Sequence, residues 1–334
     1  MIDGLKENGH EVVLCRVDPK ECGGFSKFLA LYKEYKKIKN IKFDQVVVGF
    51  PGHSVVWLAR ILFGNKIIFD AFTSLYDSNV FDRKLYSKFS IWGMRDWLLD
   101  FYSCQISHKV LLDTNEHIKF FIKSFFVNQK KFIRVFVGSN EKIFYPRKTG
   151  IDNSIFTVHF HGSYIPLQGV EYIVKSAILL KNENIKFRFI GGNKNMLKLI
   201  NDEIVLNKLT NIEPVGQVSL ENLAEEIAKS DICLGIFGDT EKAKRVIPNK
   251  VFEGVAMGKA VVTMRSPAIL ELFMENENII LCEPANPKGL ADKILLLKND
   301  PMLVKRISDA SYKLFTEKLN TKSIAGQFLY DIVL

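Results

Sequence analysis

The chain alternates short apolar runs with longer segments of helical periodicity, and this alternation limits the folds open to it. Residues 43–50, 65–72 and 108–114 are apolar runs that end in glycine, aspartate or another polar loop residue. Each is strand-length and is followed by an amphipathic stretch. Strands that alternate with helices form parallel sheets covered on both faces. The sequence therefore predicts an α/β protein.

The alternation occurs twice and breaks once, at residues 146–154 (PRKTGIDNS). At 334 residues the chain is long enough for two domains. We therefore predict two Rossmann-like domains facing each other, residues 1–148 and 149–314. A C-terminal helix at about 315–334 is a candidate to pack back onto the first domain.

Three segments give specific secondary-structure expectations. Residues 1–10 are typical of the tail of a helix, so the first domain lacks an opening strand. The run EVVLCRV, residues 11–17, predicts a strand. Residues 82–103 and 266–277 predict helices from their apolar spacing.

Composition excludes several classes of protein. With 47% hydrophobic and 25% charged residues, the chain is typical of folded soluble proteins. It shows no signal peptide and no apolar run long enough to span a bilayer. Its five cysteines are scattered and odd in number, which favours reduced thiols and a cytoplasmic location.

The net charge of +9 is confined to the first half. Residues 1–150 contain 24 Lys and Arg against 15 Asp and Glu, whereas the remainder is balanced. Aromatic residues are interspersed with these cations, as in residues 84–102. Such a surface suits an anionic membrane or an acidic ligand. No nucleic-acid-binding motif is present, so we predict no nucleic-acid partner.

Residues 238–264 predict a basic loop, a short helix and a buried strand. Pro248 fits the first helical turn and Gly258 the stop. Helical spacing places Val251, Phe252, Val255 and Ala256 on one face, and Asn249, Lys250 and Glu253 on the opposite face. A helix N-terminus beside cations favours anions. A surface helix after a solvated loop is the alternative.

Three strand ends of the second half carry glycine, in the sequences HFHGSY, FIGGN and GIFGDT. In parallel α/β sheets, ligands bind outside the carboxyl ends of the strands. These ends are therefore expected to converge beside the start of the Pro248 helix.

The sequence resembles retaining glycosyltransferase family 4, whose members have two facing Rossmann-like domains (the GT-B architecture). The resemblance is carried by HGSYIPLQGVEYIVKSAILL, VIPNKVFEGVAMGKAVVT, FDAFTSLYDS and VGSNEKIFYP, in the family's order. By this resemblance, about 30 residues, including the first strand, are absent upstream.

The resemblance implies a transferase that moves a sugar from a UDP- or GDP-linked donor, with retention and without metal or cofactor. The implied acceptor is a glycan or a lipid-linked glycan intermediate in polysaccharide or cell-envelope synthesis. Such an enzyme is expected to be cytoplasmic and peripheral at the inner face of an anionic membrane.

The resemblance also assigns roles to residues. Glu253 matches the second acid of the family's motif of two glutamates, which binds the ribose, whereas Arg245 stands in place of the first. Ser163 and Gln168 replace the usual arginine and lysine. We therefore expect a relocated clamp on the diphosphate, formed by Lys244 and Arg245.

The other expected site residues follow the same logic. Asp70, at a strand end, is the candidate base for the acceptor, with His53 and Asp77 as weaker acceptor-side candidates. The expected donor-binding residues are Gly162, Ser163, Gln168, Gly169, Gly191, Val218, Pro248, Asn249, Lys250 and Glu253.

Two other functions remain open from the sequence. One is a sugar-nucleotide epimerase of the same architecture, and the other is a non-catalytic nucleotide-sugar-binding homologue. The sequence does not define the sugar, the base or the acceptor.

Overall fold

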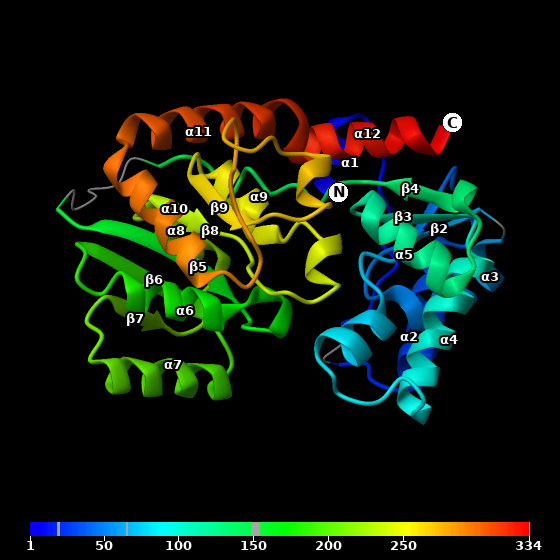
Figure 1. Ribbon diagram of the computed structural model, residues 1–334. Helices are drawn as coiled ribbons and strands as arrows, with labels where there is room; N and C mark the ends of the chain where they lie inside the picture. Colours follow the sequence, from blue (N-terminus) through cyan, green and yellow to red (C-terminus); the bar gives the residue numbers. More distant parts are fainter. Residues whose placement is uncertain (19–20, 65, 148–153, 334) are drawn as a thin grey trace. The chain divides into compact units, whose positions relative to one another are not determined.

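The computed structural model describes residues 1–18, 21–64, 66–147 and 154–333, and the chain forms two compact units (Figure 1). The first contains residues 1–80, 84–135 and the chain from Ala325 onward, and the second contains 81–83 and 136–324. The predicted boundary at 148/149 lies within 148–153, outside the described residues.

The first unit is built on a four-stranded parallel sheet of order β1-β2-β3-β4. The strands are β1 (Val46–Val48), β2 (Ile67–Asp70), β3 (Lys109–Leu112) and β4 (Phe132–Arg134). Its helices are α1 (Ile2–Glu7), α2 (Ser26–Ile38), α3 (Val56–Phe63), α4 (Ile91–Ile106) and α5 (Asn115–Phe125). The alternation of strand and helix predicted for this half is therefore present.

Successive strand residues of this sheet enter two different apolar layers. Phe69 and Val110 pack with Phe121 and Phe125 of α5. On the other face, Ile68, Leu111 and Ile133 pack against Phe328. Phe328 belongs to α12 (Thr321–Val333), the final helix of the chain, which thus covers one face of the first sheet.

The second unit contains a six-stranded parallel sheet of order β10-β9-β8-β5-β6-β7. Its strands are β5 (Phe156–Gly162), β6 (Ile185–Gly191), β7 (Ile212–Val215), β8 (Ile232–Leu234), β9 (Ala260–Met264) and β10 (Ile280–Cys282). The chain proceeds outward from β5 to β7 and then returns to the other side of β5 at β8. This doubly wound order places a topological switch point between β5 and β8.

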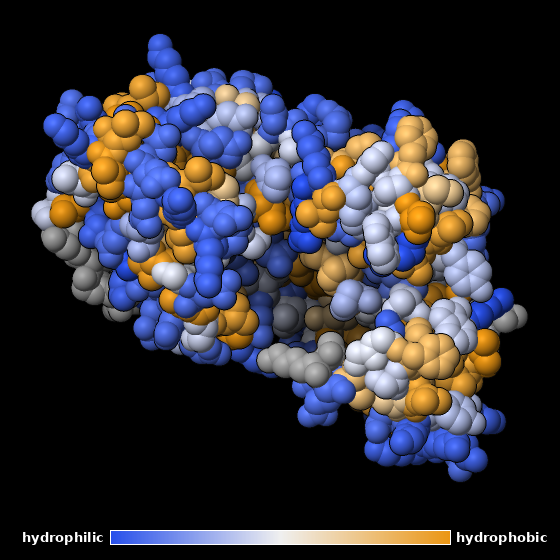
Figure 2. Space-filling model, turned by 90° about the horizontal axis from the view of Figure 1, so that it is seen from below, coloured by the Kyte–Doolittle hydropathy of each residue, from blue (hydrophilic) through white to orange (hydrophobic). Residues whose placement is uncertain are grey.

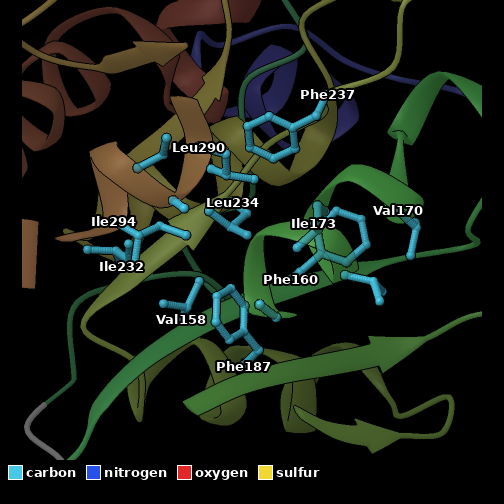
Figure 3. Close-up of a cluster of buried hydrophobic side chains, with 14 of the residues drawn as sticks. Val158, Phe160, Val170, Ile173, Phe187, Ile232, Leu234, Phe237, Leu290 and Ile294 are labelled. Carbon is cyan, nitrogen blue, oxygen red and sulfur yellow. The ribbon is translucent and has the colours of Figure 1, made fainter. Parts of the chain in front are cut away.

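Helices cover both faces of the second sheet. They are α6 (Val170–Leu179), α7 (Lys194–Asn207), α8 (Leu220–Ala228), α9 (Asn249–Ala256), α10 (Pro287–Asn299) and α11 (Pro301–Leu314). Figure 3 shows one of the apolar layers, in which Val158 and Phe160 of β5 lie with Ile173 of α6 and Ile294 of α10. The opposite face packs on α9, whose Gly254 lies against Val261 and Cys233.

Three predicted elements differ from the structure. Residues 11–17 form no strand: Cys15 lies near α2, its thiol 3.9 Å from the Leu31 carbonyl, and no ladder pairs with the segment. The helix expected at 82–103 begins only at Ile91, because Lys84 has φ 51° and the Ser90 hydroxyl caps the first turn by accepting from the Gly93 N–H.

The helix expected at 266–277 is reduced to a 3₁₀ turn, Ile269–Glu271. The Asn278 side chain accepts a hydrogen bond from the Met274 N–H at 2.8 Å, and Asn276 has φ 58°. Local side-chain bonds of this kind compete with helix formation. Among the described residues, no helix is both long and apolar enough to cross a bilayer.

Candidate functional site

The loops after β5 and β8 interlock at the switch point of the second sheet. The Phe237 N–H donates to the Gln168 carbonyl (3.1 Å), and the Gly238 N–H donates to that of Leu167 (3.3 Å). Gly169 has φ 61°, and a Cβ there would lie 2.4 Å from the Gly238 nitrogen. Only glycine fits this position. The backbones of the two loops therefore contact each other directly, at the place where ligands bind such sheets.

The ends of β5 and β6 are joined in the same way. The Gly192 N–H donates to the Gly162 carbonyl at 2.7 Å. A Cβ on Gly191, which has φ 93°, would lie 2.5 Å from that carbonyl oxygen. Gly162 and Gly191 therefore lie at adjacent strand ends of one sheet, whereas Gly169 precedes α6 in the loop after β5 and lies against Gly238.

Gln168 and Ser163 occupy the loop after β5 with different exposure. Gln168 is buried, and its Oε1 accepts a hydrogen bond from the Tyr164 N–H at 3.0 Å, which closes the loop. Ser163 is exposed, and its carbonyl accepts from the Asn193 side chain at 3.2 Å. Val218 is 36% exposed in the loop between β7 and α8, two residues after Gly216, whose carbonyl accepts from the Gly191 N–H at 3.2 Å.

Helix α9 begins at Asn249, which is exposed, and Pro248 is its N-cap residue. Pro248 thus precedes the first turn by one position. The predicted apolar face is confirmed, since Val251, Phe252, Val255 and Ala256 are all buried. Gly258, with φ 66°, follows the helix as the expected stop.

The sequence-based placement of Lys250, on the helix face opposite the apolar residues, is wrong for its side chain, which is buried. The residue is only 4% exposed, and its Nζ lies 4.1 Å from the centroid of the Phe160 ring. This ammonium has no hydrogen-bond partner among the described residues. Burial lowers its pKa to about 7, although the negative charge of Glu253 opposes the shift.

Glu253 is the end of a chain of three bonded side chains. Its Oε2 lies 2.7 Å from Nε2 of His161, and Nδ1 of His161 lies 2.9 Å from Nε2 of His159. The two histidines alternate along β5 with Val158 and Phe160, so they point to the sheet face that carries α9. Burial lowers the pKa of both imidazoles, that of His159 most strongly.

Lys244 and Arg245 end a 3₁₀ turn, Ala243–Arg245, just before α9. The Lys244 ammonium contacts the Glu241 carboxylate at 2.6 Å, and both cations lower the pKa of that carboxyl group. Glu241 therefore offsets part of the positive charge of this loop. The clamp formed by Lys244 and Arg245 stays a prediction.

In the first unit, Asp70 is the last residue of β2, as predicted. Burial raises its pKa to about 6, while a backbone hydrogen bond from Phe50 and the nearby His53 oppose the shift. The group is therefore mostly a carboxylate at neutral pH. Its pKa is also close enough to neutral pH for it to accept and release a proton.

His53 and Asp77 follow strand ends, but both side chains are buried in this structure. His53 Nε2 lies 3.3 Å from Oδ1 of Asp100. Asp100 also accepts from the Ser74 hydroxyl at 2.6 Å and from the Tyr76 N–H at 2.9 Å. Asp100 therefore shapes the loop after β2, and His53 is packed beside it.

Sequence reasoning missed His159, His161 and Asp100. The two histidines had a signal, because polar residues at alternate positions of an otherwise apolar strand share one face. Asp100 had none, since a single acid in a helix is ordinary. Within the described ranges, no three His, Cys, Asp or Glu side chains gather as a metal site requires.

The second unit of the chain matches a known family model. Residues 155–300 match the family model described as Glycosyl transferases group 1. A curated relative, an uncharacterized glycosyltransferase of Methanocaldococcus jannaschii, is 27% identical over 168 residues, which cover 48% of this chain. The match spans 43% of that relative's length.

Solved structures show the same fold. HepE from Anabaena in complex with UDP has a TM-score of 0.73 at 13% identity, covering 91% of this chain and 82% of its own. Sucrose-phosphate synthase from Thermosynechococcus elongatus has a TM-score of 0.72 at 15% identity, covering 92% and 78%. A glycosyltransferase from Rickettsia africae has a TM-score of 0.66 at 17% identity, covering 98% and 86%. The predicted α/β class with two parallel sheets is therefore confirmed.

Proposed function

We propose that this chain, whose second unit carries the match to group 1 glycosyltransferases, moves a sugar from a nucleoside-diphosphate donor to a glycan or lipid-linked acceptor. The observation that carries the proposal is the arrangement at the switch point. Lys250, a buried ammonium with no hydrogen-bond partner in the part of the chain that the structure describes, shares one helix with the carboxylate of Glu253, beside glycine-lined strand ends. A ligand that carries both an anionic group and a diol can bind the ammonium through its anion and the carboxylate through its hydroxyl groups.

Glu253 is assigned to the ribose. Its Oε2 is bonded to His161, and its side chain is 15% exposed, which leaves Oε1 as an acceptor for ligand hydroxyl groups. The base is proposed to be uracil or guanine, and the solved complex of HepE with UDP favours a uridine nucleotide.

Lys250 and the N-terminal end of α9, which no side chain caps among the described residues, are assigned to the diphosphate. Departure of a nucleoside diphosphate leaves negative charge on the β-phosphate while the sugar becomes oxocarbenium-like. The ammonium and the helix N-terminus stabilise that charge, with Lys244 and Arg245 as further cations. We therefore propose metal-independent transfer with retention, in which the leaving phosphate guides the acceptor hydroxyl to the same face.

Asp70 is the proposed acceptor-side base. It stands at the carboxyl end of a strand in the first unit, and its pKa of about 6 leaves it charged at neutral pH. His53 and Asp77 are secondary candidates, because both are buried.

The segment 84–98 is proposed to contact an anionic membrane. Its exposed apolar side chains are Leu85, Phe89, Ile91, Trp92, Met94 and Leu98, from 54% to 82% exposed. Its exposed charges, Lys84, Lys88 and Arg95, are all positive, and its one acid, Asp96, is buried. Figure 2, a view from below, shows hydrophobic side chains intermixed with hydrophilic ones on the exposed face of the first unit, at the right of the picture.

Cations beside aromatic side chains suit the headgroup region of anionic lipid. Lys88 lies 4.8 Å from the Phe89 ring, and Arg95 lies 4.8 Å from the Trp92 ring. We therefore propose a peripheral location at the cytoplasmic membrane face, in polysaccharide or cell-envelope glycan synthesis.

Vesicle sedimentation tests the membrane surface. The double variant Lys84→Glu/Lys88→Glu should lower partitioning to phosphatidylglycerol vesicles about tenfold or more, because each lost cation contributes roughly 1 kcal/mol. The matched control is Lys194→Glu/Lys198→Glu on exposed positions at the start of α7. Equal loss in both double variants, or no binding by the wild type, would remove segment 84–98 from the proposal.

Donor screening tests the catalytic proposal. Products are read by mass spectrometry with UDP- and GDP-sugars as donors and a membrane lipid extract as acceptor. Transfer that is lost in Arg245→Ala and Glu253→Gln supports the site. Donor conversion without acceptor would instead indicate an epimerase, and calorimetric binding without any turnover would indicate a non-catalytic binding protein.

A further inference from the structure

The three-residue chain of His159, His161 and Glu253 links the interior of the second sheet to the helix that borders the candidate site. Its two distances, 2.9 Å and 2.7 Å, are those of good hydrogen bonds. His159 is fully buried, and the His161 side chain is 12% exposed. Buried polar side chains destabilise a protein unless they are hydrogen-bonded. The bonds of these three side chains therefore restrict which nitrogen atom can carry each proton.

The protons of the chain can be assigned from the bonding pattern. The Glu253 carboxylate is an acceptor, so Nε2 of His161 must donate to it. Neutral His161 then has a bare Nδ1, which accepts from the Nε2–H of His159. This leaves Nδ1 of His159 as a buried acceptor, and that atom has no hydrogen-bond partner among the described residues. Burial, which lowers the pKa of both imidazoles, favours this neutral form, with each ring in one tautomer.

The charged groups around the chain come from three elements. Lys250 on α9 lies near His161 and Glu253, while Arg188 on β6 and Lys259 before β9 act on His159 at longer range. All three are cations, so they disfavour a second proton on either imidazole.

The pairing also separates Glu253 from Lys250. The two residues are one helical turn apart, at a spacing that commonly gives ion pairs. Here the carboxylate is bonded to His161 instead, and the Lys250 ammonium is left without a hydrogen-bond partner in the described structure. Glu253 is therefore held by His161 and not by the cation on its own helix.

We propose that His161, supported by His159, is a positioning residue that makes the site selective for a ribose over a 2′-deoxyribose. It fixes one oxygen of Glu253, so that the other oxygen accepts from the ligand diol in a single orientation. The inference rests on the proposed donor site.

Calorimetry with UDP and 2′-deoxy-UDP, or with the guanine pair if GDP binds better, tests this proposal. The readout is the ratio of the two dissociation constants, since a general loss of packing would weaken both ligands alike. His161→Phe should reduce the ratio about tenfold, the scale of one hydrogen bond to a charged group. His161→Gln should retain most of it, because its amide can donate to Glu253 from the position of Nε2. His108→Phe, at an exposed position in the first unit, is the matched control.

The outcomes separate the inference from the function on which it rests. A ratio unchanged in His161→Phe but lost in Glu253→Gln overturns the positioning role alone. No nucleotide binding by the wild type, or a ratio unaffected by Glu253→Gln, overturns the donor-site assignment and the inference with it. If His161→Phe does not fold, His161→Asn replaces it, because the shorter amide cannot reach Glu253 in the same way.

Discussion

Replacing Lys250 by methionine should stabilise the protein while removing its affinity for nucleoside diphosphates. The folded state lowers the pKa of this lysine from 10.5 to about 7 through burial. At 1.36 kcal/mol per pKa unit, the penalty at neutral pH is about 4 kcal/mol. The contact with the Phe160 ring, at 4.1 Å, offsets about 1–2 kcal/mol of it. Methionine has a similar length and carries no charge, so we expect a gain of about 2–3 kcal/mol.

The pH dependence has a definite sign. Between pH 7 and 10.5 the unfolded chain binds a proton on Lys250 that the folded chain lacks, so stability rises with pH across this window. The variant should lose this rise. A gain of this size raises the melting temperature of a unit of this length by about 5–10 °C at pH 7.

Thermal unfolding of the wild type and Lys250→Met at pH 7, 8 and 9 measures both effects. The difference in melting temperature should shrink as the pH increases. Calorimetric titration with UDP or GDP at pH 8, in buffers of different ionisation enthalpy, should show proton uptake in the wild type, because the diphosphate favours the charged ammonium.

Two results would refute this reasoning. The first is a Lys250→Met variant that is less stable than the wild type at pH 7, which would mean that the ammonium contributes more than its burial costs. The second is nucleotide binding of unchanged affinity in the variant, which would remove Lys250 from the diphosphate site.

Three further predictions concern other parts of the structure. Gly169→Ala should destabilise the protein by about 1–3 kcal/mol in denaturant titrations, because its Cβ would lie 2.4 Å from the Gly238 nitrogen; Gly216→Ala, with open space around it, is the control. Asp70→Asn should lower kcat by about 100-fold or more, and in the wild type the acid limb of kcat/KM against pH should bend near pH 6; an unchanged kcat would exclude Asp70 as the base. Asp100→Asn should cost about 2–3 kcal/mol, because a charged acceptor for the Ser74 hydroxyl and two backbone N–H groups is lost; a melting temperature equal to that of the wild type would contradict this.

The fold was largely predictable because the spacing of apolar residues along the sequence indicates which side of each helix or strand is buried. The strand at 156–162 carries apolar residues at alternate positions, and the Pro248 helix carries them at helical spacing. The structure buries Val158 and Phe160 of the strand and the apolar face of the helix. The errors fall where a local bond decides the outcome. Asn278 interrupts a helix with one side-chain hydrogen bond, and residues 11–17 have strand-like composition but pair with no strand.

The candidate site was predictable only as far as backbone geometry allowed. Glycines at strand ends can be recognised in the sequence, because two backbones that approach closely leave no room for a larger residue. The direction of Lys250 did not follow from helical spacing, since a long side chain beside the helix start can bend inward over Phe160. The bond between His161 and Glu253 joins residues 92 positions apart, which a linear pattern does not show.

Helix α12 has a consequence for biosynthesis. The face of the first sheet formed by Ile68, Leu111 and Ile133 is covered by Phe328, a residue made long after the strands. At translation rates of about 5–20 residues per second, this apolar surface stays uncovered for roughly 10–40 seconds, until Phe328 has been synthesised. All six strands of the second sheet are made within this interval, so we expect that sheet to form before α12 covers the first one. The first sheet, although it is synthesised earlier, would then be the part that chaperones protect.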